Sequence, residues 1–143
     1  MKKLLATGLL LLLAGCQNNE QAGTIEQQEK DPVQTDRVID HNGQVENLEL
    51  LHQFLKDTDE NKQTSLEMTR YTIEGAQIYW KVEFEEGEYN IEVDNREDNF
   101  GSKNIENYQC DKLSKDVTGS LTDYNFESCE GGYEINLLSV ISE

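Results

Sequence analysis

Two neighbouring stretches of the chain alternate strictly between apolar and polar residues. Residues 78–84 carry Ile, Trp, Val and Phe at every second position, and residues 89–93 carry Tyr, Ile and Val in the same way. A period of two predicts strands with one buried and one solvated face. Residues 66–73 read as a third strand, and the Glu74-Gly75 and Glu86-Gly87 turns predict that the three pair as antiparallel neighbours.

A different period precedes these strands. Leucine and phenylalanine recur at helical spacing between residues 48 and 55, and Asn47 stands where a helix N-cap is expected. The sequence therefore predicts a helix over residues 48–57. The Asp-His-Asn-Gly stretch at residues 40–43 predicts a turn before it.

Further candidate strands cover residues 105–110, 121–129 and 133–140. The apolar stripe of the helix matches the apolar face of the strands, and a helix and a sheet bury such faces against each other. We therefore expect one α+β domain over residues 35–143. In it, one N-terminal helix packs on an antiparallel meander sheet of about five strands.

The first sixteen residues have the anatomy of an export signal. Lys2 and Lys3 precede an apolar run over residues 4–13, which is too short to span a bilayer as a helix. The run ends in Leu13, Ala14, Gly15 and Cys16, which resembles the lipobox of bacterial lipoproteins. The resemblance implies a signal peptide over residues 1–15 and a diacylglyceryl anchor on Cys16, on the extracytoplasmic face of the cell membrane. The alternative is an ordinary signal peptide cut near a cysteine.

Residues 16–34 are rich in Gln, Asn and Glu and contain the only proline, Pro32. Such a segment buries too little apolar surface to order itself. We interpret it as the lipidated N-terminus followed by a disordered tether that spaces the domain from the membrane.

The charge balance excludes one class of partner. The net charge is −17, and loss of Lys2 and Lys3 with the signal peptide makes it −19. Nucleic-acid phosphates require Lys and Arg, so no nucleic-acid partner is expected. The balance favours cations or basic partners, and the protein or small-molecule partner itself stays open.

Two cysteines remain beside Cys16. Cys110 and Cys129 form an even pair in a chain marked for export, which favours a disulfide, although two unpaired buried thiols are the alternative. A bridge at this spacing would contribute about 3 kcal/mol to stability. No further Cys or His lies nearby to complete a metal site, so no metal is expected there.

The densest polar loop contains Asp94, Asn95, Asp98, Phe100 and Gly101. Its oxygen ligands invite a calcium interpretation. However, an arginine occupies a ligand position of the EF-hand pattern, and the twelfth-position glutamate is missing. We favour a structural loop, in which Asp and Asn cap the turn, Gly101 takes a special backbone angle and Phe100 pins the loop to the core.

Catalytic chemistry has little support in the sequence. Glu83, Glu85 and Glu92 fall on the solvated strand face, where such a row more often protects a sheet than binds a ligand. His41 and His52 are the only histidines, and neither stands in a nucleophile–base pattern. We therefore expect no enzyme activity and no cofactor.

Four groups of residues stand out together: Asp36-x-Val38 with Gly43-x-Val45-x-Asn47-Leu48, Arg70-Tyr71-Thr72-Ile73-Glu74-Gly75 with Ile78, Asp94-Asn95-x-x-Asp98-x-Phe100-Gly101, and Cys110. In this combination the chain resembles a domain-of-unknown-function family of small Bacillus-type lipoproteins, over about residues 33–140. That family usually has a proline where this chain has Gln77. The resemblance implies no catalytic residues, and it implies a Gram-positive cell with a single membrane.

The expected function is therefore a membrane-anchored, extracytoplasmic lipoprotein that acts as a non-catalytic binding or interaction module. One alternative is an inhibitor-like module that acts on an envelope or secreted hydrolase, by analogy with other folds that lay one helix across a meander. A less favoured alternative is an envelope enzyme that uses a carboxylate pair.

Overall fold

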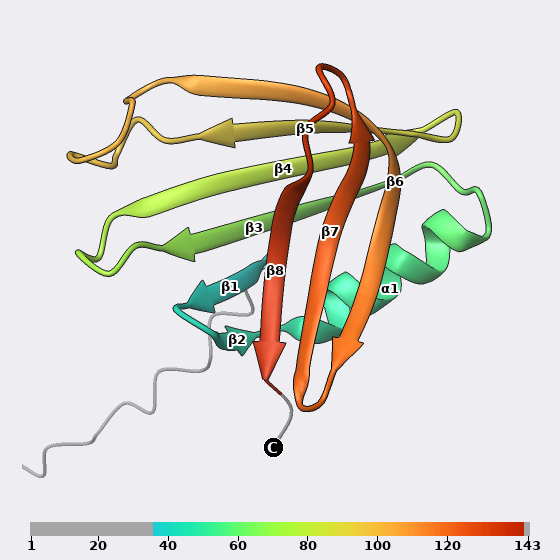
Figure 1. Cartoon of the computed structure of the whole chain (residues 1–143), viewed down its shortest axis with the longest axis horizontal. Coiled ribbons are helices and arrows are strands. Elements are labelled where there is room, and N and C mark those ends of the chain that lie inside the picture. Colours follow the sequence, from blue (N-terminus) through green and yellow to red (C-terminus); the bar gives the residue numbers. More distant parts are fainter. Residues whose placement is uncertain (1–35, 142–143) are drawn as a thin grey trace, which may run out of the picture. The chain divides into compact units, whose positions relative to one another are not determined.

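The computed structural model describes residues 36–141, all of which belong to the unit Val33–Glu143. Within that range the chain forms one helix and eight strands (Figure 1). In chain order they are β1 (Val38–His41), β2 (Gln44–Glu46), α1 (Leu48–Asp59), β3 (Thr64–Tyr71), β4 (Gln77–Glu85), β5 (Glu88–Asp94), β6 (Ile105–Thr118), β7 (Leu121–Cys129) and β8 (Ile135–Ile141).

The eight strands form one sheet in the order β2-β1-β3-β4-β5-β6-β7-β8. Neighbouring strands are antiparallel except for β1 and β3, which run parallel. Parallel strands need a crossover connection, and α1 supplies it here. The prediction of a helix on a five-stranded antiparallel meander is therefore wrong. The domain is mostly sheet, and the sheet is mixed and has eight strands.

The long strand β6 pairs with a different neighbour along each of its two halves, and the sheet bends between them. Up to Cys110 it pairs with β5, and from Cys110 to Thr118 it pairs with β7. Figure 1 shows β6, β7 and β8 crossing in front of β3, β4 and β5, so that the sheet curls into a half-barrel. The sheet thus has two arms. One consists of β2, β1, β3, β4, β5 and the first part of β6, and the other consists of the rest of β6 with β7 and β8. The core lies between these two arms, and α1 covers only part of it.

The aromatic ring of Tyr89 lies where the two arms and the helix meet. Its centroid is 4.8 Å from that of Phe84 on β4, 5.4 Å from that of Phe126 on β7 and 6.3 Å from that of Phe54 on α1. Aromatic pairs at such separations stabilise a core beyond the area they bury. This cluster therefore joins three segments that are distant in sequence.

Two parts of the sheet escaped the sequence prediction for physical reasons. Residues 111–118 contain only two aliphatic side chains, Leu113 and Val117, so they lack the expected alternation. They are a strand because β7 pairs with them in register. Strands β1 and β2 are three or four residues long and flank Asn42 and Gly43, whose φ values of 54° and 94° suit a two-residue hairpin.

The predicted helix is present and extends to Asp59. Asn47 occupies its N-cap position, with a left-handed φ of 57°, but makes no capping hydrogen bond with its side chain. Its Nδ2 instead donates to the carbonyl of Arg37 at 2.9 Å. The asparagine therefore links the start of the helix to the residue before β1.

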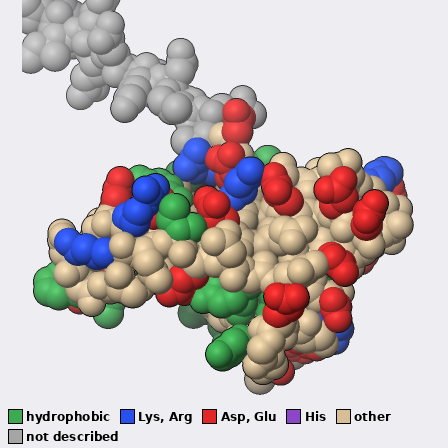
Figure 2. All heavy atoms as spheres, turned by 90° about the horizontal axis from the view of Figure 1, so that it is seen from above, with side chains coloured by type: hydrophobic (Ala, Val, Ile, Leu, Met, Phe, Trp, Pro, Cys, Tyr) green, Lys and Arg blue, Asp and Glu red, His purple; other side chains and the backbone are tan. Residues whose placement is uncertain are grey.

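Charge is distributed unevenly over the surface. In Figure 2, Asp and Glu side chains spread across most of the visible face, whereas most of the visible Lys and Arg lie in its left half. No helix among residues 36–141 has the length and apolarity needed to cross a membrane.

Candidate functional site

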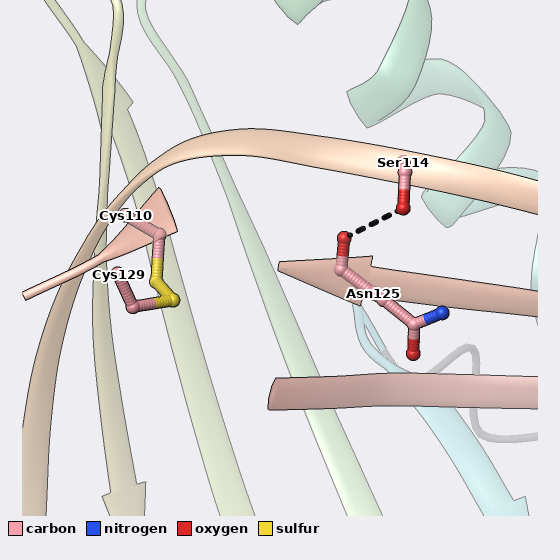
Figure 3. Close-up of a disulfide and its surroundings, with 4 residues drawn as sticks. All are labelled: Cys110, Ser114, Asn125 and Cys129. Atoms are coloured by element: carbon pink, nitrogen blue, oxygen red, sulfur yellow. Dashed lines mark hydrogen bonds between the residues drawn. A yellow bond between two sulfur atoms is a disulfide. The ribbon is translucent and has the colours of Figure 1, made fainter. Parts of the chain in front are cut away.

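The predicted disulfide between Cys110 and Cys129 is present (Figure 3). The two residues face each other on β6 and β7, at the point where β6 passes from one arm of the sheet to the other. Their exposed fractions are 0 % and 5 %, so the bond lies in the core. Farther along the same strands, Ser114 Oγ donates to the carbonyl of Asn125 at 3.2 Å (Figure 3).

The carboxylate of Asp94 is fully engaged by Arg96. Its Oδ1 accepts from the backbone N–H and Nε of Arg96 at 3.0 and 2.9 Å, and its Oδ2 accepts from Nη2 at 2.7 Å. These hydrogen bonds lower the pKa of Asp94 to about 2. The residue that would begin a calcium loop is therefore already neutralised by a guanidinium. Among residues 36–141, no group of three or more His, Cys, Asp or Glu side chains is placed to hold a metal ion.

The pairing of Asp94 with Arg96 predicts a measurable shift in the acid titration of the Asp94 carboxyl group. The Asp94 carboxyl should titrate near pH 2 rather than near its ordinary value of 3.8. Because the folded-state pKa is lowered, the contribution of this pairing to stability is complete above about pH 4 and is lost as the pH falls toward 2. Carboxyl-carbon NMR shifts would measure it. Arg96→Ala should raise the pKa, whereas Lys103→Ala should leave it unchanged; a wild-type titration near 3.8 would contradict the assignment.

The rest of this loop differs from the prediction in two respects. Phe100 is 81 % exposed and therefore does not pin the loop to the core. Its backbone N–H donates to Asp98 Oδ1 at 2.9 Å, and the N–H of Asp98 donates to the carbonyl of Asn95 at 3.0 Å. Gly101 has no positive φ. A Cβ at this position would lie 2.7 Å from Asp98 Oδ2, so any larger residue would require the Asp98 side chain to shift.

A polar groove of about 320 Å³ crosses the outer face of β4, β5 and β6. Two of the three predicted wet-face glutamates, Glu83 and Glu92, line it, whereas Glu85 lines a separate hollow beside Gln63 and Thr64. We call this site the outer groove, and its polar lining comes from Lys81, Glu83, Asn90, Glu92, Asn107, Gln109 and Glu130.

Strand register explains why these groups converge. Glu92 lies opposite both Lys81 on β4 and Asn107 on β6, and Asn90 lies opposite both Glu83 and Gln109. These residues therefore form two adjacent rows across the sheet. Alternation along the strands places the glutamates on the solvated face, but no local pattern in the sequence pairs them with β6.

The outer groove retains unused hydrogen-bonding capacity. Lys81 Nζ pairs with Glu83 Oε1 at 2.8 Å, and the hydrogen bond that Lys81 donates to this carboxylate raises the pKa of Lys81. The side chains of Asn90 and Asn107, by contrast, make no hydrogen bond with any other residue in the 36–141 range. Amides and carboxylates together present both donors and acceptors to a ligand.

A buried ion pair lies at a second opening, of about 330 Å³, between the β1–β2 turn and β8. Arg70 Nε is 3.3 Å from Asp40 Oδ2, and Arg70 Nη2 donates to the carbonyl of Leu137. The guanidinium carbon lies 5.3 Å from the ring centroid of Trp80. Gly43 donates its N–H to Asp40 Oδ1 at 2.7 Å. Arg70 therefore connects β1, β3, β4 and β8.

Sequence reasoning missed the role of Arg70. Burial lowers the pKa of its guanidinium, while the charge of Asp40 opposes that effect. A signal was available, because Leu66, Met68 and Arg70 occupy alternate positions of β3, and the first two are in the core. A cation at an inward-facing position predicts a buried partner.

The two histidines have ordinary surroundings. The ring of His41 stacks on that of Tyr71 with centroids 4.5 Å apart, and its Nε2 lies 3.6 Å from Glu46 Oε1. His52 is exposed, and its Nε2 lies 3.5 Å from the hydroxyl of Tyr124. The predicted cleavage motif and lipidation site, Leu13 to Cys16, lie outside the described residues.

Comparison with known proteins identifies the family. The model of a family described as Domain of unknown function (DUF4362) matches residues 35–125. The chain therefore belongs to this family, as its resemblance to a family of unknown function predicted. Neither a curated protein nor a solved structure matches the chain. The matched range includes Arg70, most of the outer groove and Cys110, and it ends before Cys129.

Proposed function

We propose that this protein is a membrane-anchored extracytoplasmic lipoprotein whose domain is a non-catalytic binding module. Residues 1–15 act as its signal peptide, Cys16 carries the lipid, and residues up to about 34 serve as the tether. The outer groove is the binding surface. Because it lies on the solvated face of the sheet, a ligand can occupy it without disturbing the core.

The observation that carries this proposal is the buried disulfide. Cys110 and Cys129 are bonded in the core, and such bonds persist in oxidising compartments but are rare in the cytosol. This supports export of the domain. In an exported chain, a cysteine placed directly after a short apolar run and two small residues is the acceptor of a lipid.

The chemistry of the outer groove indicates the kind of ligand. Free amides at Asn90 and Asn107 and carboxylates at Glu83 and Glu92 suit a ligand that carries hydroxyl or ammonium groups. Anionic polymers are disfavoured by the same carboxylates. The inhibitor-like alternative rested on a helix-on-meander architecture that the chain does not have.

Photo-crosslinking in intact cells tests the binding surface. A photoreactive residue in place of Asn107 should give a discrete higher-mass adduct of the lipoprotein, because this position lines the outer groove. The matched control carries the same residue in place of Val117, which is 65 % exposed but lies near the end of β6, away from the groove. Equal adducts at both positions, or none at either, would contradict the proposal.

A further inference from the structure

Two exposed apolar side chains lie at the same end of the domain. Ile73, in the β3–β4 turn, is 90 % exposed, and Phe100, in the β5–β6 loop, is 81 % exposed. Figure 1 places both connections at the left end of the sheet, and Figure 2, which keeps the same horizontal axis, shows apolar side chains at that end. We call Ile73 and Phe100 the apolar tips.

Local hydrogen bonds define the backbone on which each tip stands. In the β3–β4 turn, Gly75 donates its N–H to the carbonyl of Thr72 at 2.9 Å, and Ala76 donates to Thr72 Oγ1 at 3.1 Å. In the β5–β6 loop, the N–H of Phe100 is held by Asp98, and Lys103 Nζ donates to Asn99 Oδ1 at 2.9 Å. Both loops thus have an internal framework that leaves the apolar side chain in solvent.

The end of the domain that carries the apolar tips differs in charge from the opposite end. The tip loops with the strand ends that flank them, residues 71–77 and 94–105, carry four carboxylates against two cations: Glu74, Asp94, Glu97, Asp98, Arg96 and Lys103. The opposite end combines the end of α1 with the β4–β5 turn (Figure 1). It carries six carboxylates against two cations: Asp57, Asp59, Glu60, Glu85, Glu86, Glu88, Lys56 and Lys62. The tip end is therefore the less negative of the two, and an anionic surface would repel it less than the opposite end.

The proposed tether is long enough to bring the tips to the membrane. Asp36 lies twenty positions after Cys16, and a chain of that length spans at most about 70 Å. The chain enters the sheet at Arg37, whose Nη2 contacts Glu67 Oε2 at 2.8 Å. Ile73 lies six residues beyond Glu67, so the tip is about 20 Å from this point along the strand direction.

We propose that the apolar tips are a second membrane contact of the lipid-anchored domain. Ile73 and Phe100 enter the interfacial region of the bilayer that holds the Cys16 anchor, and the acidic end faces away from it. This inference rests on the proposed lipoprotein function. It assigns these two exposed apolar side chains a lipid partner and fixes the orientation in which the outer groove is presented to the cell envelope.

Depth-dependent fluorescence quenching tests this contact. The full lipidated chain would be purified from membranes and reconstituted into phosphatidylcholine–phosphatidylglycerol vesicles that contain brominated lipid. Tryptophan in Phe100→Trp should be quenched by about two-fold or more, because bromine quenches only at close range to the acyl region. Val117→Trp, at an exposed site near the other end of β6, should be quenched no more than the wild type, whose Trp80 is buried.

The outcomes separate this inference from the function on which it rests. Protein that fails to float with the vesicles refutes the lipid anchor and the membrane contact together. Protein that floats but shows equal quenching for Phe100→Trp and Val117→Trp refutes the contact alone and leaves a protein partner as the occupant of the tips. Loss of the Phe100→Trp signal when Ile73 is also changed to Ser would show that the two tips act together.

Discussion

Replacement of Arg70 by alanine is expected to lower the free energy of unfolding by about 3–5 kcal/mol. The side chain of Asp40 is only 9 % exposed, so the substitution leaves a buried carboxylate without its cation. It also removes the donor to the Leu137 carbonyl, which links β3 to β8. Urea unfolding of the purified chain, followed by far-UV circular dichroism, measures the change.

Two control variants separate the buried ion pair from charge in general. Arg96→Ala removes an exposed guanidinium that pairs with Asp94, and solvent screening leaves such a surface pair with little effect on stability. The double variant Asp40→Asn/Arg70→Met replaces both charges and should recover much of the loss, because neither partner is then left unpaired. If Arg70→Ala costs no more than Arg96→Ala, Arg70 does not hold the two arms of the sheet together.

Reduction of the Cys110–Cys129 bond is expected to lower the free energy of unfolding by about 2–5 kcal/mol. The bond closes a loop with a sequence separation of 19, and it lies where β6 passes from β5 to β7. Loss of the bridge therefore increases the conformational entropy of the unfolded chain. It also removes a covalent link at the position where β6 changes its pairing partner. Urea unfolding with and without dithiothreitol measures the effect.

The control for this prediction is Cys16→Ala. The same sensitivity to dithiothreitol should persist in that variant, because Cys16 takes no part in the bond. The variant Cys110→Ala/Cys129→Ala should be insensitive to dithiothreitol. A wild-type midpoint that is the same in both buffers would mean that the disulfide contributes nothing to the stability of the folded domain.

Local periodicity predicted the central part of the fold. The alternation in residues 78–84 and 89–93 located β4 and β5 to within a few residues, and the helical spacing located α1. These elements can be predicted from the sequence because one face of each is buried and the other is exposed to solvent. Strand order, curling and the parallel β1–β3 pair depend on contacts across the core, such as that of Tyr89 with Phe126, and no local pattern encodes them.

The candidate sites were predictable to different degrees. The disulfide was predicted from the two cysteines that remain beside Cys16 in a sequence that begins with an export-signal pattern, and the structure contains it. Glu83 and Glu92 were placed on the solvated face by alternation, but Asn107 joins them only through the register of β5 with β6. The prediction that Phe100 pins its loop to the core is wrong, because hydrogen bonds within the loop define its backbone and leave the side chain in solvent.

The central claim is that Cys16 carries a lipid that holds a disulfide-bonded domain outside the cell. Mass spectrometry of the native protein, extracted from the membrane fraction and digested, tests it most directly. The account predicts an N-terminal peptide that begins at Cys16 and carries the mass of a diacylglyceryl group. Protein recovered in the cytosolic fraction with residues 1–15 still attached, and with Cys16 unmodified, would contradict it.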